Sequence, residues 1–352
     1  MNGDATVPTP LQQRTLYCIA KDPGSTDKEI AECCGAEQAS VAKARRALWE
    51  RGYFSKVLLL QFQNIGYRYM TMAYINSIMV RFEVQRKKIV APEDAFSPED
   101  IFELYFTNIH MAMRPHRLKD DAEAHDKALR HHWVDEVGVE PDLMDVLTAD
   151  LRKGLTTMYY NYASVVAHVY DLKDLPTIRA ATFFKDDRVN RRITDAEREV
   201  LFALGKYPPE PAEALAKRLK LTRDGLDKVV QGLVDANIAS RGVIVNVHRL
   251  NMDFLHLFRV TYKKELPLMK RRPIIEWSLN SQPMFIKFEE ELDTFGIGCY
   301  KSHEEYDKKL GNIADKILPY IDRVRIPSMV GFSIPPCEKC KFLDQEYYIR
   351  FL

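Results

Sequence analysis

The sequence predicts an α+β protein in which two winged helix-turn-helix domains are each followed by an α/β, ferredoxin-like domain. Residues 16–75 match residues 201–260 without a gap, at a constant offset of 185, and apolar positions and an early turn coincide. In each copy, three short helical patterns, with a tight turn between the second and third, precede a strand pattern. This order is typical of a winged helix-turn-helix.

The helical patterns of the two copies have clear ends. In the first copy Gly35 ends the second helix, and Val41, Ala44 and Leu48 place one apolar stripe on the third. In the second copy Thr194 is the expected N-cap of the first helix. The expected elements are helices over 11–20, 28–34, 38–51, 212–219 and 222–235, and strands over 53–62 and 240–247.

The segments that follow the two copies differ in clarity. After the second copy the patterns read strand, helix, strand, strand, helix, strand, which is the split βαβ order of a ferredoxin-like domain. These elements are expected at 254–263, 273–279, 284–292, 295–300, 303–318 and 323–333. Residues 76–193 fit less well and predict either a sensor domain with a helical insertion or a distinct fold. Helices are expected there at 97–113, 122–134 and 141–154, and a strand at 158–170.

The expected domain boundaries follow from these elements. The segments are a tail (1–10), a first winged helix (11–63), a middle α/β domain that is a candidate divergent sensor (64–190), a second winged helix (191–249), a ferredoxin-like sensor (250–335) and a C-terminal tail (336–352).

Composition limits the class of protein. The chain has 352 residues, 46% hydrophobic and 29% charged, which excludes global disorder. No apolar run approaches the ~20 residues of a membrane span, and no secretory signal is present. Six cysteines are too sparse for a disulfide scaffold, so a reducing cytoplasm is expected. A net charge of +1 excludes a histone-like wrapper but allows a local basic face.

Charge distinguishes the two third helices. Residues 38–51 carry a net charge of +3, from four basic residues and one acid, whereas residues 222–235 carry −1, from two basic residues and three acids. Because phosphate neutralisation supplies most non-specific affinity, the first copy is the better candidate for binding double-stranded DNA. We expect Ser40, Lys43 and Arg46 to face outward as readers of base edges, and Arg45, Arg51 and Lys56 to hold phosphates. Weaker candidates are Thr222, Arg223, Lys228 and Arg241. The alternative is a solvated basic face.

These patterns resemble the Lrp/AsnC family of prokaryotic regulators. The resemblance is carried by residues 201–247, by Leu250-Asn251-Met252, by the segment from Ser302 to Asp307 and by 319–330, and in the first copy by Gly52-Tyr53 and 64–67. It implies a winged helix joined to a ferredoxin-like domain that binds a small-molecule effector and forms a homodimer. The chain departs from the family in holding two such units in tandem.

The resemblance also draws attention to the hairpin between the middle strands of the second sensor. Family members carry a glycine and an acidic pair there, near the effector site. This chain has Glu289-Glu290-Glu291-Leu292-Asp293 without that glycine. Glu291 and Asp293 are therefore candidates either for effector binding or for solvated hairpin charges, and the second reading is favoured.

Two groups of residues are weak candidates for metal or haem. His125 and His132 lie seven positions apart on an expected helix, hence on one face, within a stretch that holds five of the nine histidines. Cys337 and Cys340 form a single CxxC, which is half of a zinc or redox motif. An exposed charged helix and an adventitious turn are the plainer interpretations, so no cofactor is expected.

The sequence thus predicts a sequence-specific DNA-binding transcription regulator that responds to a small molecule and is not an enzyme. One alternative is an enzyme of the Lrp/AsnC-related branch that decarboxylates sirohaem. The other is a winged-helix scaffold that binds protein.

Overall fold

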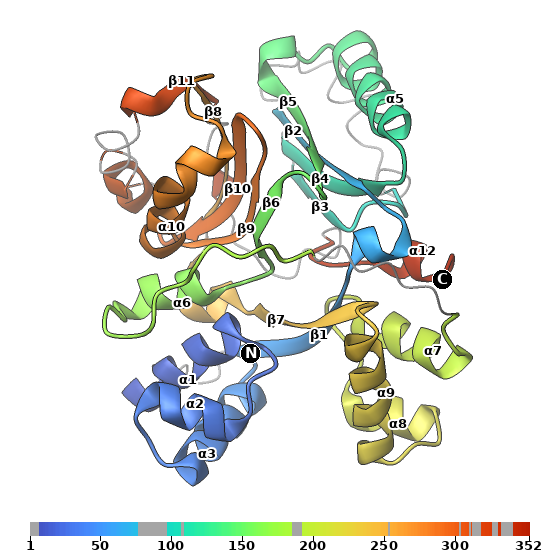
Figure 1. The fold of residues 1–352 in the computed structure, drawn as a ribbon, viewed down its shortest axis with the longest axis vertical. Coiled ribbons are helices and arrows are strands. Elements are labelled where there is room, and N and C mark those ends of the chain that lie inside the picture. The colour runs from blue at the N-terminus through green and yellow to red at the C-terminus, as the bar shows by residue number, and fades with distance from the viewer. Residues whose placement is uncertain are drawn as a thin grey trace. The chain divides into compact units, whose positions relative to one another are not determined.

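The chain folds as two compact units that each draw on both halves of the sequence. The computed structural model describes residues 7–76, 97–106, 109–184, 192–252, 254–302, 304–309, 311, 318–325, 330–331 and 341–352 (Figure 1). Unit 1 consists of Met1–Val57, Leu155–Phe183 and Arg241–Pro335. Unit 2 consists of Leu58–Gly154, Phe184–Ser240 and Pro336–Leu352. Each unit therefore contains one helical copy and the sheet that belongs to the other copy.

The first helix trio lies at the N-terminus and ends in a strand. It comprises α1 (Pro10–Lys21), α2 (Asp27–Cys34) and α3 (Gln38–Glu50), followed by β1 (Phe54–Leu60). Thr9 and Thr26 form capping boxes at the starts of α1 and α2, which satisfy backbone N–H groups that lack helical partners. Gly35 ends α2 in the left-handed conformation, with a φ of 63°.

The second helix trio repeats this arrangement. It comprises α7 (Asp195–Leu204), α8 (Ala212–Arg218) and α9 (Arg223–Asp235), followed by β7 (Ala239–Val245). Thr194 caps α7, as expected. The left-handed residues also recur at the offset of 185, in the pairs Gly35 and Lys220, Gly52 and Asn237, and Gly66 and Asn251. The duplicated helical fold is therefore confirmed. β1 pairs with β7, so each trio supplies one strand of a shared two-stranded ribbon.

The first sheet has four strands in ferredoxin-like order. The strands are β2 (Tyr69–Asn76), β3 (Phe102–Phe106), β4 (Ile109–His116) and β5 (Met144–Asp150), arranged β3-β4-β2-β5. Counted along the chain, the order across the sheet is fourth, first, third, second. The helices expected at 97–113 and 141–154 are wrong, because these segments form strands: β4 and β5 each pair antiparallel with β2, and β3 pairs antiparallel with β4. The helix expected at 122–134 is confirmed as α5 (Lys119–Arg130), which continues in a π-helical turn over His131–Glu136.

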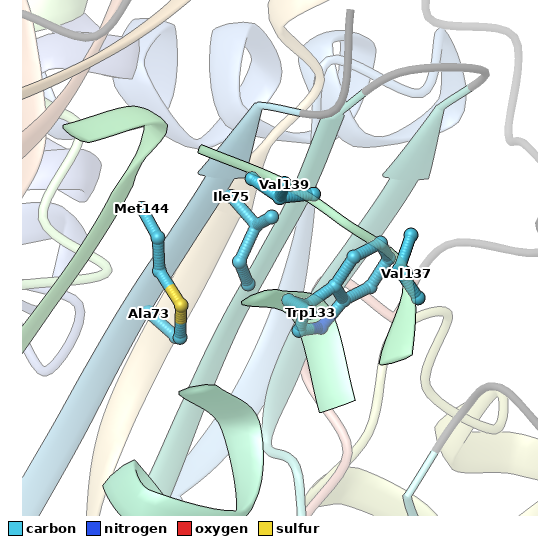
Figure 2. Close-up of a cluster of buried hydrophobic side chains, with 6 residues drawn as sticks. All are labelled: Ala73, Ile75, Trp133, Val137, Val139 and Met144. Atoms are coloured by element: carbon cyan, nitrogen blue, oxygen red, sulfur yellow. The ribbon is translucent and has the colours of Figure 1, made fainter. Parts of the chain in front are cut away.

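The core beside this sheet is built around Trp133. Figure 2 shows its indole among Ala73 and Ile75 of β2, Met144 of β5, and Val137 and Val139 of the segment after the π-helical turn. All six side chains are buried. Burial of aromatic and aliphatic surface is the main favourable term in folding, so this cluster fixes the end of α5 against the sheet.

The second sheet has the same order with one addition. Its strands β8 (Phe254–Tyr262), β9 (Met284–Glu289), β10 (Asp293–Tyr300) and β11 (Ile321–Arg325) run β11-β8-β10-β9, again fourth, first, third, second. The short β12 (Val330–Gly331) also pairs with β8, and α10 (Arg272–Ser281) is the helix expected at 273–279. The ferredoxin-like prediction is confirmed for this domain.

The addition is a strand from the first half of the chain. β6 (Leu155–Tyr159) pairs with β9 at the edge of the second sheet and is followed by α6 (Ala163–Tyr170). The single strand expected at 158–170 is therefore wrong beyond Tyr160. The remaining short elements in the described ranges are helical residues 304–309, within the helix expected at 303–318, the C-terminal helix α12 (Glu346–Ile349), and the 3₁₀ turns Phe62–Ile65, Pro141–Leu143, Val247–Leu250, Leu268–Arg271 and Leu318–Tyr320.

The C-terminal segment is anchored in unit 2. Gln345 is fully buried, and its side chain hydrogen-bonds the backbone of β1 and of the residue after α7. No helix in the described ranges has the length and apolar character needed to span a membrane.

Candidate functional site

The outer face of α3 presents the predicted readers together. Val41, Ala44 and Leu48 are buried toward α1 and α2, as the helical spacing predicts. Ser40, Lys43 and Arg46 are exposed, and neither of the two cations forms an ion pair within the described residues. These three side chains are here called the α3 face. Two of them, Lys43 and Arg46, present exposed positive charges that a polyanion could contact.

The three predicted phosphate-holding residues are arranged differently. Arg45 is half-buried and donates to Asp27 Oδ1 at 2.9 Å, which joins α3 to α2. The Arg51 guanidinium lies 5.0 Å from the ring centroid of Tyr53 and donates to Gln12 Oε1 at 3.4 Å. Lys56 is exposed on β1. Arg45 and Arg51 therefore brace the first helix trio, and Lys56 is the more accessible of the three.

The equivalent face of the second trio is largely neutralised. Arg223 donates to Glu213 Oε1 at 3.1 Å and lies 3.6 Å from Asp227 Oδ2. The Thr222 hydroxyl accepts from the backbone N–H of Gly225 and serves as the N-cap of α9. Lys228 is exposed, and Arg241 is half-buried on β7. These ion pairs, together with the net charges of the two helices, make α3 a better candidate than α9 for contact with DNA.

The two candidate effector residues do not form a pair. Glu291 is exposed at the hairpin. Asp293 accepts from Arg259 Nε at 3.0 Å and from Thr261 Oγ1 at 2.7 Å, which ties β10 to β8. Its carboxylate is thus already engaged by groups of the sheet itself.

The structure separates His125 from His132. The π-helical turn places His132 on the surface, where it pairs with Glu136 at 2.8 Å. His125 instead packs against His116 at the end of β4, with ring centroids 5.2 Å apart. His116 Nε2 and His125 Nδ1 are buried and have no hydrogen-bond partner within the ranges that the structure describes. Burial, reinforced by the Arg114 guanidinium, lowers the pKa of His116 to about 4 and of His125 to about 3, so both rings are neutral near pH 7.

The structure describes only one of the two candidate metal groups, the histidines. Cys337 and Cys340 lie outside the described residues. Across the described ranges, no three His, Cys, Asp or Glu side chains are arranged to hold a metal ion.

Sequence reasoning missed a buried charged cluster in unit 1. Lys287 Nζ contacts Glu289 Oε1 at 2.5 Å, and the Arg271 guanidinium lies 4.2 Å from the ring centroid of Tyr262. All three charged side chains are buried, and Arg271 Nε and Nη1 have no hydrogen-bond partner in the described part of the chain. Lys287 and Glu289 are two residues apart on one strand and therefore share a face, which was the available signal.

The buried histidine pair predicts a pH-dependent stability. Because the unfolded chain takes up these protons near pH 6.5 and the folded chain only near pH 4 and 3, the unfolding free energy falls as the pH drops below 6.5. We expect a loss on the order of 4 kcal/mol between pH 7 and pH 5 from the pair, about 2 kcal/mol from each histidine. Urea unfolding of His116→Gln/His125→Gln should show a smaller loss, whereas the exposed pair His131→Gln/His132→Gln should behave as the unaltered protein. Equal pH dependence in all three proteins would contradict the assignment.

Comparison with known proteins yields likeness of fold only. No protein-family model matches the sequence, and no curated protein matches it. Among solved structures, the siroheme decarboxylase NirDL in complex with an iron-uroporphyrin III analogue is 12% identical, with 97% of each chain covered and a TM-score of 0.46. An AsnC-family transcriptional regulatory protein from Pyrococcus furiosus is 14% identical over 40% of this chain and 88% of its own, with a TM-score of 0.27. E. coli AsnC is 12% identical over 41% of this chain and 93% of its own, also with a TM-score of 0.27.

The order of elements defines the class of protein. Along the sequence, each of the two copies consists of a helix trio, a linking strand and a sheet in ferredoxin-like order. Each copy has the winged helix-turn-helix and the ferredoxin-like sheet order that the resemblance to the Lrp/AsnC family implied, and the chain holds two such copies in tandem.

Proposed function

We propose that this protein is a sequence-specific DNA-binding transcription regulator that contacts DNA through α3. The observation that carries the proposal is the α3 face, where Ser40, Lys43 and Arg46 are exposed on a helix whose opposite stripe is buried. A recognition helix enters the major groove with such a face toward base edges and phosphates. Lys56 contacts the phosphate backbone beside it, and Arg45 acts by holding α3 against α2.

The proposal includes a small-molecule effector and a homodimer. The buried cluster of unit 1 supports an effector with an anionic group, because two buried guanidinium nitrogens of Arg271, Nε and Nη1, have no acceptor among the described residues. Glu291, exposed at the neighbouring hairpin, is the remaining acidic candidate for a cationic group on the same effector. Dimerisation through the sheet domains would set the spacing of DNA half-sites.

A salt titration tests DNA binding. The protein is mixed with genomic fragments, including its own promoter, and its affinity is measured at increasing salt concentration. We expect selective binding whose log affinity falls linearly with log salt, with a slope that counts phosphate contacts. No binding even at low salt would refute the proposal and favour a winged-helix scaffold that binds protein.

A second candidate function, an enzyme acting on a tetrapyrrole, is favoured by the histidine pair. His116 is buried and His125 is half-buried, both rings are neutral near pH 7, and each has a buried ring nitrogen without a hydrogen-bond partner among the described residues. Neutral imidazole binds haem iron and transfers protons, so these residues suit an iron tetrapyrrole or its carboxylates. The Arg114 side chain is held nearby by Asp100 and Glu99 and would orient an acidic substituent only by releasing one of them.

Absorption spectroscopy tests this second function. Iron-uroporphyrin III is titrated into the purified protein, and a shift of its Soret band reports binding. We expect His116→Ala/His125→Ala to abolish the shift, while the surface control His131→Ala/His132→Ala retains it. A spectrum identical to that of the free tetrapyrrole would remove this candidate.

A further inference from the structure

Three cysteines meet inside the first helix trio. Cys18 lies in the second half of α1, and Cys33 and Cys34 are the last two residues of α2. The Cys18 thiol donates to Cys33 Sγ at 2.7 Å, and Cys18 Sγ lies 3.8 Å from Cys34 Sγ. Cys18 and Cys34 are buried, and Cys33 is half-buried. This cysteine trio lies apart from the α3 face and plays no part in the function proposed above.

We propose that Cys18 and Cys33 form a redox-active pair, and that hydroperoxides oxidise this pair to an intramolecular disulfide. A disulfide has a sulfur–sulfur distance of about 2.05 Å, so closure needs a sulfur displacement of well under 1 Å from the separation seen here. Cys33 is the most accessible of the three sulfurs, which places it first in contact with an oxidant.

The reaction balances with the hydroperoxide as two-electron oxidant. Cys33 sulfur attacks the terminal peroxide oxygen, the O–O bond breaks, and the alcohol leaves while Cys33 becomes a sulfenic acid. Cys18 sulfur then attacks Cys33 sulfur, the S–O bond breaks, and water leaves. Overall, two thiols lose two electrons and two protons, and the peroxide is reduced to alcohol and water.

Cys34 is positioned to assist the second step. Its sulfur adjoins that of Cys18, and the hydrogen bond between these two thiols, with the Arg14 guanidinium, lowers the pKa of Cys34 against the opposing effect of burial. Cys34 therefore acts as the base that takes the Cys18 proton as that sulfur becomes a nucleophile. A bond between Cys33 and Cys34 is disfavoured, because both residues are helical and adjacent in α2.

The disulfide would join α1 to the C-terminal end of α2, just before the turn that leads into α3. It would close a loop between positions 15 apart in the sequence and restrict the unfolded chain. Oxidation is therefore expected to raise the melting temperature of the protein, and a dithiol reductant should reverse the rise.

Peptide mapping by mass spectrometry tests the pair. The full chain with Cys337→Ser and Cys340→Ser is reduced, exposed to hydrogen peroxide, alkylated and digested. We expect one linked peptide that joins Cys18 to Cys33, lost in Cys18→Ser and kept in the matched control Cys299→Ser. Cys34→Ser should give the same link at least several-fold more slowly.

Three outcomes would overturn the inference. They are the absence of any linked peptide, a link between Cys33 and Cys34, and protection of all three thiols from alkylation by a bound metal ion that a chelator removes. Because mapping uses no DNA, a failure here is distinct from a failure of DNA binding.

Discussion

Lys43→Glu with Arg46→Glu is expected to lower DNA affinity about 100-fold or more near physiological salt, since each base or phosphate contact is worth ~1–3 kcal/mol. Both cations are exposed and form no ion pair in the described part of the chain, so their charge is available to DNA. Because the two substitutions also remove two positive charges from the interface with DNA, the salt slope should fall by up to about two. Fluorescence anisotropy with the preferred fragment measures both quantities.

The second helix trio supplies the matched control. Arg223→Glu with Lys228→Glu makes the same change of charge at the equivalent helix, where Arg223 is already paired with Glu213 and Asp227. We expect affinity to change by less than about threefold, because a paired surface cation contributes little. An equal loss from both double substitutions would mean that overall charge, and not the α3 face, drives binding. Unchanged melting temperatures would show that both proteins fold.

Gln345→Ala is expected to destabilise the protein by about 3 kcal/mol, because each buried polar group left without a partner costs ~1–3 kcal/mol. Gln345 Oε1 accepts from the backbone N–H of Leu60 at 2.7 Å. Its Nε2 donates to the carbonyls of Leu58 at 2.8 Å and Gly205 at 2.9 Å. The substitution strands three backbone groups and opens a cavity at a position with no solvent exposure. Urea unfolding measures the change.

The neighbouring residue is the control for this substitution. Glu346 is half-exposed and pairs with Arg350 one helical turn away. Glu346→Ala should change the unfolding free energy by less than about 0.5 kcal/mol, as surface substitutions usually do. A cost below about 1 kcal/mol for Gln345→Ala would mean that water satisfies the stranded groups.

The helix trios could be predicted because their signals are local. Caps such as Thr194, the stop at Gly35 and the stripe of Val41, Ala44 and Leu48 lie within one or two helical turns of the structure they determine. Because the same pattern repeats at a fixed offset, the two copies support each other, and together they predict the fold more strongly than either copy alone.

The first sheet could not be predicted in the same way. Ser97-Pro98-Glu99-Asp100 reads as a helix start, and methionine and alanine in β4 favour helix when considered alone. In the structure Met113 pairs opposite Met72, and Ala112 opposite Ala73. These partners are about 40 positions apart in the sequence, so no local pattern contains them, and pairing overrides propensity.

The candidate site shows the same difference between features with local sequence signals and features that depend on tertiary contacts. The outward face of α3 followed from helical spacing, whereas the engagement of Arg45 by Asp27 depends on how α2 packs beside α3. The contact of His125 with His116 was missed because His116 belongs to a strand that the sequence did not predict.

The exchange of parts between the two repeats limits how this chain can evolve. β6 is encoded with the first repeat but completes the edge of the second sheet, and each compact unit needs pieces from both repeats. A tandem protein whose repeats fold independently can lose, shuffle or multiply a repeat by recombination. Here a breakpoint between the repeats would separate the pieces of both units, so recombination at that point is expected to disrupt folding.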